Sequence, residues 1–373
     1  MTSRCHVGDS GDGTYREGVK VRLSDIAHEL GISAASVSRS LNGRPGVSPQ
    51  LRDQVLQAAT AAGYVAPATR AAQEANNPAS RPPLVGIIVP ELTNPVFPAF
   101  ASVMTTMLAE QGYLPILCSQ SEPGVSEDAW LALLTSHRTQ GIIVVSGMHA
   151  DTHASTRRYD ELREAHVALA LVNGHVPDLD ASFISVDDAG AVGAAVEFLA
   201  GLGHTRIGLA LGPERFVPVI AKTEGYRRAL ERHVPGVDPD SLIAHSTFSL
   251  EGGVAAADQL IDHDATAIIC ASDVMALGAI RAARARGLSV PGDLSIVGFD
   301  DASFSAHADP ALTSLRQPIR AMATAAVSAV LEELRNGVHS SRELLFNAEL
   351  IVRSSTAVVP DSRRAVRRTP RTA

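Results

Sequence analysis

Residues 21–65 read VRLSDIAHELGISAASVSRSLNGRPGVSPQLRDQVLQAATAAGYV, and this stretch decides the fold of the amino-terminal part of the chain. Its apolar residues recur at helical spacing in three groups, each beginning at a serine that can cap a helix and ending at a glycine. The groups cover residues 24–31, 33–43 and 48–63. Pro49 follows the third serine, and proline at the first helical position loses no hydrogen bond. The pattern predicts three short helices with a small core of their own.

The turn between the first two predicted helices points to a nucleic-acid partner. Two helices joined by a three-residue turn around a glycine form the arrangement in which the second helix lies in the DNA major groove. The stretch resembles the DNA-binding domain of the lactose/galactose repressor (LacI/GalR) family, on the SAASVSRSLN segment at 33–42 and the VS pair at 47–48. The resemblance implies a DNA-binding transcriptional regulator, most commonly a repressor, that binds a pseudo-palindromic double-stranded DNA operator as a homodimer.

The same resemblance assigns roles to residues of the second helix and of the helix starts. The implied base contacts are Ala34, Ala35, Ser36, Ser38 and Arg39, and the implied phosphate contacts are Ser24, Ser33, Asn42 and Ser48. Arg39 is the long donor of the set, and a pair with guanine O6 and N7 is worth about 1–3 kcal/mol of discrimination. A solvated charge at Arg39 and simple helix caps at the serines remain alternatives. We expect Val37 and Leu41 to belong to the core.

Residues 67–83 have almost no large apolar side chain and end in a proline pair, which predicts a hinge or linker. A typical family member carries a leucine here that inserts into the minor groove. This chain has RAAQ at 70–73 and no leucine after it. We expect Arg70 to bind a phosphate or the minor groove, and whether the hinge bends DNA stays open.

After residue 83, short β-rich apolar runs alternate with alanine-rich helical stretches, which predicts doubly wound parallel sheets. The resemblance continues over residues 84–359, for example in VPELTNPVF at Val89 and SIVGFDD at Ser295. It implies the α/β fold of type I periplasmic sugar-binding proteins, with two lobes and a ligand cleft at the carboxyl ends of the strands. The predicted parts are a disordered extension (1–18), a three-helix helix-turn-helix head (19–66), a hinge (67–83), an N-lobe (84–202 and 313–336), a C-lobe (203–312 and 337–359) and a disordered basic tail (360–373).

Positions that match effector contacts in sugar-responsive relatives follow from the resemblance. They are Pro95, Val96, Asp187, Lys222, Phe248, Ser272 and Asp300. Asp300 is the strongest candidate, because a charge directly after a buried strand is costly unless it meets a ligand or a donor. A loop cap at Asp300, a core role for Phe248 and a solvated charge at Lys222 remain alternatives. We expect Asp273 and Asp301 to be structural.

Two of these positions depart from the family. Relatives usually carry arginine where this chain has Lys222 and often asparagine where it has Ser272. An ammonium group cannot reproduce the planar fork of a guanidinium. The expected effector is a sugar or sugar derivative, and these departures leave open that it is not a common hexose.

Charge is unevenly distributed along the chain. The formal net charge is −8, which taken alone argues against a polyanionic partner. Residues 19–70 contain six basic and three acidic residues, and the last thirteen residues contain five arginines and one acid. Since residues 1–18 carry −1, residues 71–360 must carry −14. A basic head on an acidic body is expected to direct DNA to the head.

Other features exclude several classes of protein. The three cysteines are few and widely spaced, and neither a signal peptide nor a long apolar segment is seen, so we expect a cytoplasmic protein without membrane contact. Phosphate-binding loops, nucleophile elbows and zinc motifs are missing from the sequence, and His149 and His153 lack further ligands. We therefore expect no enzymatic activity, no cofactor and no metal. The remaining alternative is a solute-binding sensor module without operator binding.

Overall fold

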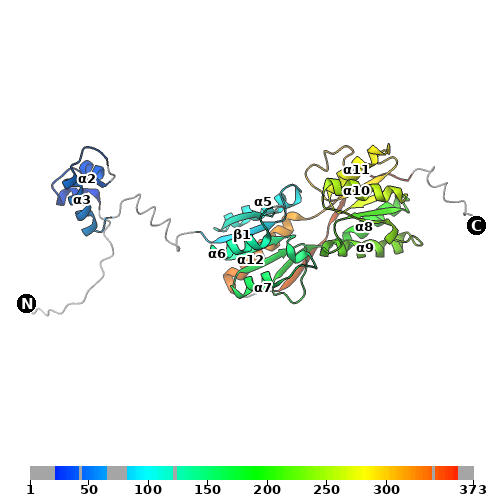
Figure 1. Ribbon diagram of the computed structural model, residues 1–373, viewed down its shortest axis with the longest axis horizontal. Helices are drawn as coiled ribbons and strands as arrows, with labels where there is room; N and C mark the ends of the chain where they lie inside the picture. The colour runs from blue at the N-terminus through cyan, green and yellow to red at the C-terminus, as the bar shows by residue number, and fades with distance from the viewer. Residues whose placement is uncertain (1–21, 42–43, 65–81, 121–123, 338–340, 360–373) are drawn as a thin grey trace, which may run out of the picture. The chain divides into compact units, whose positions relative to one another are not determined.

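The computed structural model describes residues 22–41, 44–64, 82–120, 124–337 and 341–359 (Figure 1). It contains two compact units, residues 1–81 and 82–373, which are described separately below. The predicted contacts Asn42 and Arg70 lie outside the described residues, as do the extension, the tail and most of the hinge.

The first unit is the predicted three-helix head. Its helices are α1 (Leu23–Glu29), α2 (Ala34–Leu41) and α3 (Pro49–Ala61). Ile26, Val37 and Val55, one from each helix, are fully buried against one another, and Leu41 is partly buried beside them. The sequence prediction of three short helices with their own core is confirmed.

The predicted cap of α1 is wrong. Ser24 lies inside the first turn of the helix, exposed to solvent, and its hydroxyl donates to Asp25 Oδ1 at 3.3 Å. The helix begins at Leu23, two residues before the start that a Ser24 cap would give, because Arg22 is the capping residue and its backbone N–H donates to Asp25 Oδ2 at 2.7 Å. An acidic side chain at the third helical position thus stabilises the start that the serine was expected to cap.

The N-lobe of the second unit is a six-stranded parallel sheet in the order β11-β5-β4-β3-β1-β2. Its strands are β1 (Leu84–Val89), β2 (Leu114–Ser119), β3 (Gly141–Val145), β4 (Ala168–Val172), β5 (Ser182–Val186) and β11 (Arg342–Phe346). Helices α6 (Glu127–Ser136) and α7 (Arg157–Glu164) cover one face, and α5 (Val96–Glu110) and α12 (Ile319–Asn336) cover the other. Neighbouring residues such as Ile87 and Ile88 face opposite cores, which explains the continuous apolar runs.

The C-lobe repeats this layout in the order β12-β10-β9-β8-β6-β7, with only the β10–β12 pair antiparallel. Its strands are β6 (Ile207–Leu211), β7 (Ile243–His245), β8 (Ala267–Cys270), β9 (Ser295–Asp300), β10 (Thr313–Arg316) and β12 (Glu349–Ile351). Its helices are α8 (Asp188–Gly201), α9 (Val217–His233), α10 (Leu250–Asp262) and α11 (Asp273–Ala285), with the short η2 (Met148–Ala150) in the N-lobe and η3 (Asp240–Leu242) before β7. Helix α8 packs on α9, and α10 packs on α11 (Figure 1).

The limits of the two lobes differ from those expected. Helix α8 belongs to the C-lobe because it packs along α9, where a Cβ atom at Gly225 would lie 2.2 Å from the carbonyl oxygen of Ala189. Strand β10 pairs with β9 of the C-lobe, whereas β11 pairs with β5 of the N-lobe. The chain therefore passes between the lobes after β5, after β10 and after β11. Strand β10 reads TSLR and β11 reads RELLF, so neither has the continuous apolar run that predicted the other strands.

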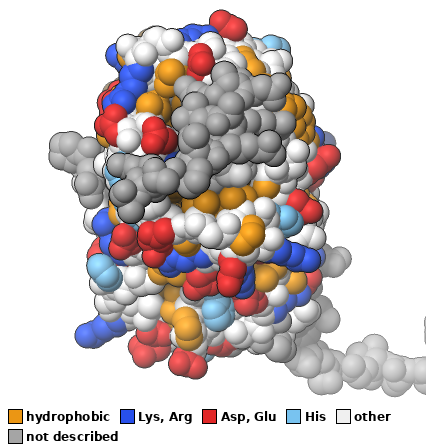
Figure 2. All heavy atoms as spheres, turned by 90° about the vertical axis from the view of Figure 1, so that its right-hand side faces the viewer, with side chains coloured by type: hydrophobic (Ala, Val, Ile, Leu, Met, Phe, Trp, Pro, Cys, Tyr) orange, Lys and Arg blue, Asp and Glu red, His pale blue; other side chains and the backbone are white. Residues whose placement is uncertain are grey.

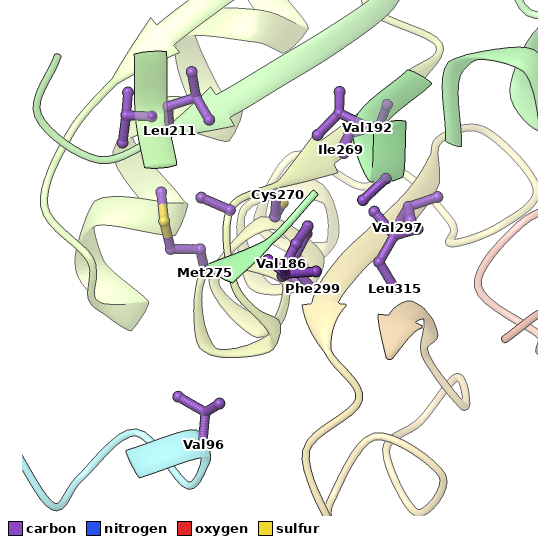
Figure 3. Packing of buried hydrophobic residues seen from close by; sticks show 14 of the residues in the cluster. Val96, Val186, Val192, Leu211, Ile269, Cys270, Met275, Val297, Phe299 and Leu315 are labelled. Atoms are coloured by element: carbon purple, nitrogen blue, oxygen red, sulfur yellow. The ribbon is translucent and has the colours of Figure 1, made fainter. Parts of the chain in front are cut away.

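The apolar core of the C-lobe reaches the region between the lobes. Figure 3 shows Phe299 and Val186 among the buried side chains, with Val96 extending toward them from the start of α5. On the surface, Figure 2 shows acidic and basic side chains interspersed over the face it presents. Among the described helices, none is long and apolar enough to cross a membrane.

Candidate functional site

Helix α2 of the head presents a small, mostly exposed surface at its start. Ala34, Ala35 and Arg39 are exposed, while Ser36 and Ser38 are half-buried. Ser33 holds the start of the helix, because its Oγ accepts from the N–H of Ser36 at 3.1 Å. This arrangement leaves two methyl groups and one guanidinium group available to a partner.

Side-chain hydrogen bonds hold Arg39 along α2 and order the segment that leads into α3. Arg39 Nε donates to the carbonyl oxygen of Ala35 at 3.3 Å, which lays its side chain along the helix. Ser48 caps α3 as expected, accepting from Leu51 N at 3.2 Å, and Arg52 donates to the carbonyl oxygen of Arg44 at 3.0 Å. The exposed Ser24 and the capping serines remain predicted phosphate contacts.

The second unit contains a cavity of about 200 Å³ lined by residues of both lobes. Five of the seven predicted effector residues line it: Val96, Lys222, Phe248, Ser272 and Asp300. Val96 and Ser272 lie at the starts of α5 and α11, and Asp300 ends β9. Phe248 lies in the loop before α10, and Lys222 lies in the second turn of α9. Ligands of open α/β folds bind at the carboxyl ends of the strands.

The other two predicted residues, Pro95 and Asp187, are not among the residues that line the cavity. Pro95 is the capping residue of α5, and Asp187 caps α8 by accepting from Gly190 N at 2.9 Å. The Asp187 side chain turns back onto its own helix, whereas Pro95 makes no side-chain cap bond; in each case the next residue, Asp188 or Val96, lines the cavity. Asp188, which the sequence analysis did not single out, takes the place expected for Asp187.

Asp188 forms a buried ion pair with Lys222. The ammonium group donates to Asp188 Oδ1 and lies 3.9 Å from the ring centroid of Phe299. The two side chains are only 8% and 7% exposed. Burial raises the pKa of Asp188, and the charge and hydrogen bond of Lys222 oppose that shift. Lys222 is therefore not the solvated charge that the sequence left open as an alternative.

Asp300 is the last residue of β9 and is 6% exposed, with a φ of +104° that few non-glycine residues adopt. Gln317 Nε2 donates to its Oδ1 at 2.6 Å. Burial raises the pKa of Asp300 well above its usual value, and the nearby Asp273 raises it further. Hydrogen bonds from Gln317 and Asn94 and the charge of Lys222 act in the opposite direction. Since Asn94 lies just before α5, Asp300 connects the two lobes.

The sequence analysis missed two amide side chains that line the cavity, half-buried Asn173 and buried Gln317. Asn173 Oδ1 and Gln317 Oε1 have no hydrogen-bond partner among the described residues, although both side chains line the cavity. Asn173 Nδ2 donates to Ser146 Oγ at 3.0 Å, and both of these residues have positive φ values. Asn173 directly follows the apolar strand β4, and Gln317 directly follows β10. The position after a strand marks the ligand edge in parallel sheets and could have identified Asn173.

Aromatic side chains form part of the cavity wall. Phe248 is 39% exposed, and its ring packs edge-on against Phe216 at 5.8 Å between centroids. A Cβ atom at Gly212 would lie 2.2 Å from Phe248 Cζ, so only glycine leaves room for the ring. Ser272 caps α11 by accepting from Met275 N at 3.2 Å, which leaves its hydroxyl proton free to donate.

Asp273 and Asp301 have the structural roles expected of them. Asp273 accepts from Ala302 N, Ser305 Oγ and Ser314 Oγ, each at 2.6 Å, and burial raises its pKa to about 6. Asp301 pairs with Arg316 and Arg353, each at 2.7 Å. In the described part of the chain, no group of three or more His, Cys, Asp or Glu side chains is arranged to hold a metal ion.

A second connection between the lobes, here called the clasp, lies beside the cavity and consists of Asp151, Thr152, Arg215 and Phe216. Arg215 Nε donates to Asp151 Oδ2 at 2.7 Å, and the N–H and hydroxyl of Thr152 donate to the Arg215 carbonyl at 2.9 and 2.8 Å. Asp151 and Phe216 form an isolated antiparallel bridge. The clasp joins the loop after β3 to the loop before α9, and Phe216 lines the cavity.

Known proteins share both units. The description "Bacterial regulatory proteins, lacI family" matches residues 22–66, and "Periplasmic binding protein-like domain" matches residues 196–356. The HTH-type transcriptional regulator MalR of Streptomyces coelicolor is 49% identical over 92% of this chain and 98% of its own. The HTH-type transcriptional repressor CytR of Escherichia coli is 32% identical over 91% of this chain and 97% of its own.

Solved structures agree with the sequence matches. A complex of the transcriptional regulator CelR with cellobiose has a TM-score of 0.66 and 27% identity, covering 90% of this chain and 99% of that one. A LacI-family regulator from Enterococcus faecium with bound ribose has a TM-score of 0.65 and 25% identity, covering 74% and 100%. With its three-helix head and its two-lobed body, the chain belongs to the lacI family of bacterial regulatory proteins.

Proposed function

We propose that this transcriptional regulator represses its target genes as a homodimer whose heads occupy the two halves of a pseudo-palindromic operator. A sugar or sugar derivative bound in the cavity between the lobes controls its affinity for DNA. A two-fold symmetric operator has two equivalent half-sites. A protein that occupies both of them needs two heads related by the same symmetry.

The observation that carries the ligand proposal is a cavity between the lobes whose wall combines polar side chains with aromatic rings. Asn173, Ser272 and Asp300 are among its polar residues, and sugar hydroxyl groups can bond with such groups because each hydroxyl both donates and accepts. The rings of Phe248 and Phe216 add apolar surface that can pack against the C–H groups of a sugar. The cellobiose and ribose complexes of the similar regulators support the same ligand class.

The DNA proposal relies on the exposed start of α2. Ala34 and Ala35 present methyl groups of the size that contacts thymine, and Arg39 presents a donor for guanine. Ser33 and Ser48 place helix starts, with their N–H groups, at the edges of this surface. Ligand control then requires a coupling free energy between cavity and head, of order 1–3 kcal/mol for typical regulators.

A selection experiment tests the proposal with the full-length chain. Random duplexes are enriched for binding at moderate salt, and the expected product is one pseudo-palindromic sequence whose binding changes when a sugar from a panel is added. A folded dimeric sample that shows no preference for any palindromic site over random duplex would overturn the repressor proposal. Sugar binding without DNA binding would favour the alternative of a solute-binding sensor.

A further inference from the structure

We propose that the cavity selects uncharged polyhydroxylated ligands and rejects anionic ones, such as sugar phosphates and sugar acids, because its single ammonium group is already neutralised by Asp188. This inference rests on the proposed sugar-binding function and adds the charge class of the ligand. It depends on the residues of this chain, since a cavity of the same fold that carried an unpaired guanidinium group would favour anionic ligands.

The cavity wall carries more acidic than basic groups. They are Glu91, Asp188, Lys222 and Asp300, three carboxyl groups and one ammonium group. Basic side chains near the cavity are engaged elsewhere, because Arg215 pairs with Asp151 and Arg316 pairs with Asp301. The net charge of the wall is therefore zero or negative whenever at least one of the three carboxyl groups is ionised. Such a wall does not attract an anion.

The ammonium group of Lys222 is poorly available to bind an anion. Its ammonium group donates to Asp188 Oδ1 and rests against the face of Phe299, and its side chain is 7% exposed. An anion that took over this ammonium group would leave the Asp188 carboxylate buried without a partner, which is strongly unfavourable. A neutral hydroxyl group can share the pair without separating it, because it both donates to the carboxylate and accepts from the ammonium.

Asp300 also disfavours an anionic ligand. Its carboxyl group is buried and accepts from Gln317, and burial already raises its pKa. A second negative charge in contact with it would disfavour the ionised form still more. A hydroxyl group, which can both donate and accept, forms a hydrogen bond with Asp300 in either protonation state.

Three helix starts at the cavity each have one first-turn N–H group engaged. Helix N-termini bind anions through unpaired N–H groups. At α5, α8 and α11, one such group donates to the side chain of Asn94, Asp187 or Ser272, respectively. These bonds reduce the number of N–H groups that an anion in the cavity could reach.

Thermal stabilisation and calorimetric titration of the full-length chain test the inference. The probes are a panel of neutral mono- and disaccharides, including cellobiose and ribose, each paired with its monophosphate. We expect the neutral member of the binding pair to bind at least about ten-fold more tightly than its phosphate. A phosphate that binds as tightly as its neutral parent, or a phosphate that binds alone, overturns the inference while the sugar-binding function stands. Failure of every probe overturns the proposed sugar-binding function itself.

Asp188→Asn tests the role of the ion pair. It frees the ammonium of Lys222, so the ratio of phosphate affinity to neutral-sugar affinity should rise by about ten-fold. Asp187→Asn is the matched control, because it removes the adjacent carboxylate, keeps a good helix cap and changes no lining residue. An unchanged ratio in folded Asp188→Asn refutes the inference. If that variant does not fold, Glu91→Gln removes a half-buried lining carboxylate and should raise the ratio in the same direction.

Discussion

Replacing Arg215 with alanine is expected to loosen the clasp between the lobes without affecting either sheet. The substitution removes the 2.7 Å hydrogen bond from Arg215 Nε to Asp151 Oδ2 and leaves the backbone contact with Thr152 in place. The Asp151 side chain is 9% exposed and the Arg215 side chain is 41% exposed. A hydrogen bond between charged groups is worth about 1.5–3 kcal/mol, and exposure reduces this toward the value of 0–1 kcal/mol of a surface pair. We therefore expect a loss of about 1–1.5 kcal/mol.

Amide hydrogen exchange measures this loss directly. The N–H of Thr152 donates across the lobes to the Arg215 carbonyl, whereas the N–H of Ser146 donates to Val172 within the N-lobe. Because 1.4 kcal/mol corresponds to a factor of ten, Thr152 should exchange about ten-fold faster in Arg215→Ala, with Ser146 unchanged. Release of a bound sugar should accelerate in parallel, since Phe216 lines the cavity.

The control is Arg157→Ala, which removes an arginine from an exposed pair with Glu161 on α7. It should leave the exchange of Thr152 unaltered. If Thr152 exchanges at the same rate in Arg215→Ala as in the parent chain, the ion pair does not hold the lobes together and the reasoning fails. If Ser146 accelerates equally, the substitution has destabilised the whole N-lobe instead.

Three further predictions concern the head, the cavity and the core. Arg39→Ala should relax the preference for one base pair in each half-site by about 1–3 kcal/mol, and equal weakening on all sequences in a binding assay would identify a phosphate contact instead. Gly212→Ala should displace the ring of Phe248, which lies 2.2 Å from the new Cβ position, and weaken sugar binding in calorimetry without changing operator affinity. Burial lowers the pKa of His149 from 6.5 to about 4, so the unfolded chain binds a proton in that range that the folded chain does not. The free energy of unfolding should therefore fall, by up to about 3 kcal/mol, as the pH falls from 6.5 to 4. In urea titrations, His149→Gln should reduce this loss and the exposed His153→Gln should not; equal pH dependence in all three proteins would contradict it.

The sequence predicted the local elements well and the sites less evenly. Three serine-to-glycine groups predicted three helices, because caps and stops are local signals, although Arg22 and not Ser24 caps the first helix. Asp300 was singled out because a charge after a buried strand needs a partner, and it has one in Gln317. Asp188 was missed in favour of Asp187, since two adjacent carboxylates differ only in which one turns back to cap the helix.

Long-range pairing limited what could be predicted about the body. The TSLR segment of β10 does not by itself specify a sheet, and only its pairing with β9 assigns it to the C-lobe. The same holds for β11, whose partner β5 lies more than a hundred residues away along the chain. Periodicity reports burial of an element, whereas sheet membership depends on contacts that a single sequence does not specify.

The positions of the cavity residues along the chain suggest how ligand binding reaches the rest of the molecule. Asp188 immediately follows the first passage between the lobes, and Gln317 lies on the second, directly after β10. A ligand bound to both side chains would therefore act on the segments whose backbone angles set the positions of the lobes. The N-lobe is the lobe that directly follows residues 65–81, which connect it in sequence to the head. Coupling of this kind needs no long chain of contacts, because the ligand acts directly on the segments that connect the two lobes.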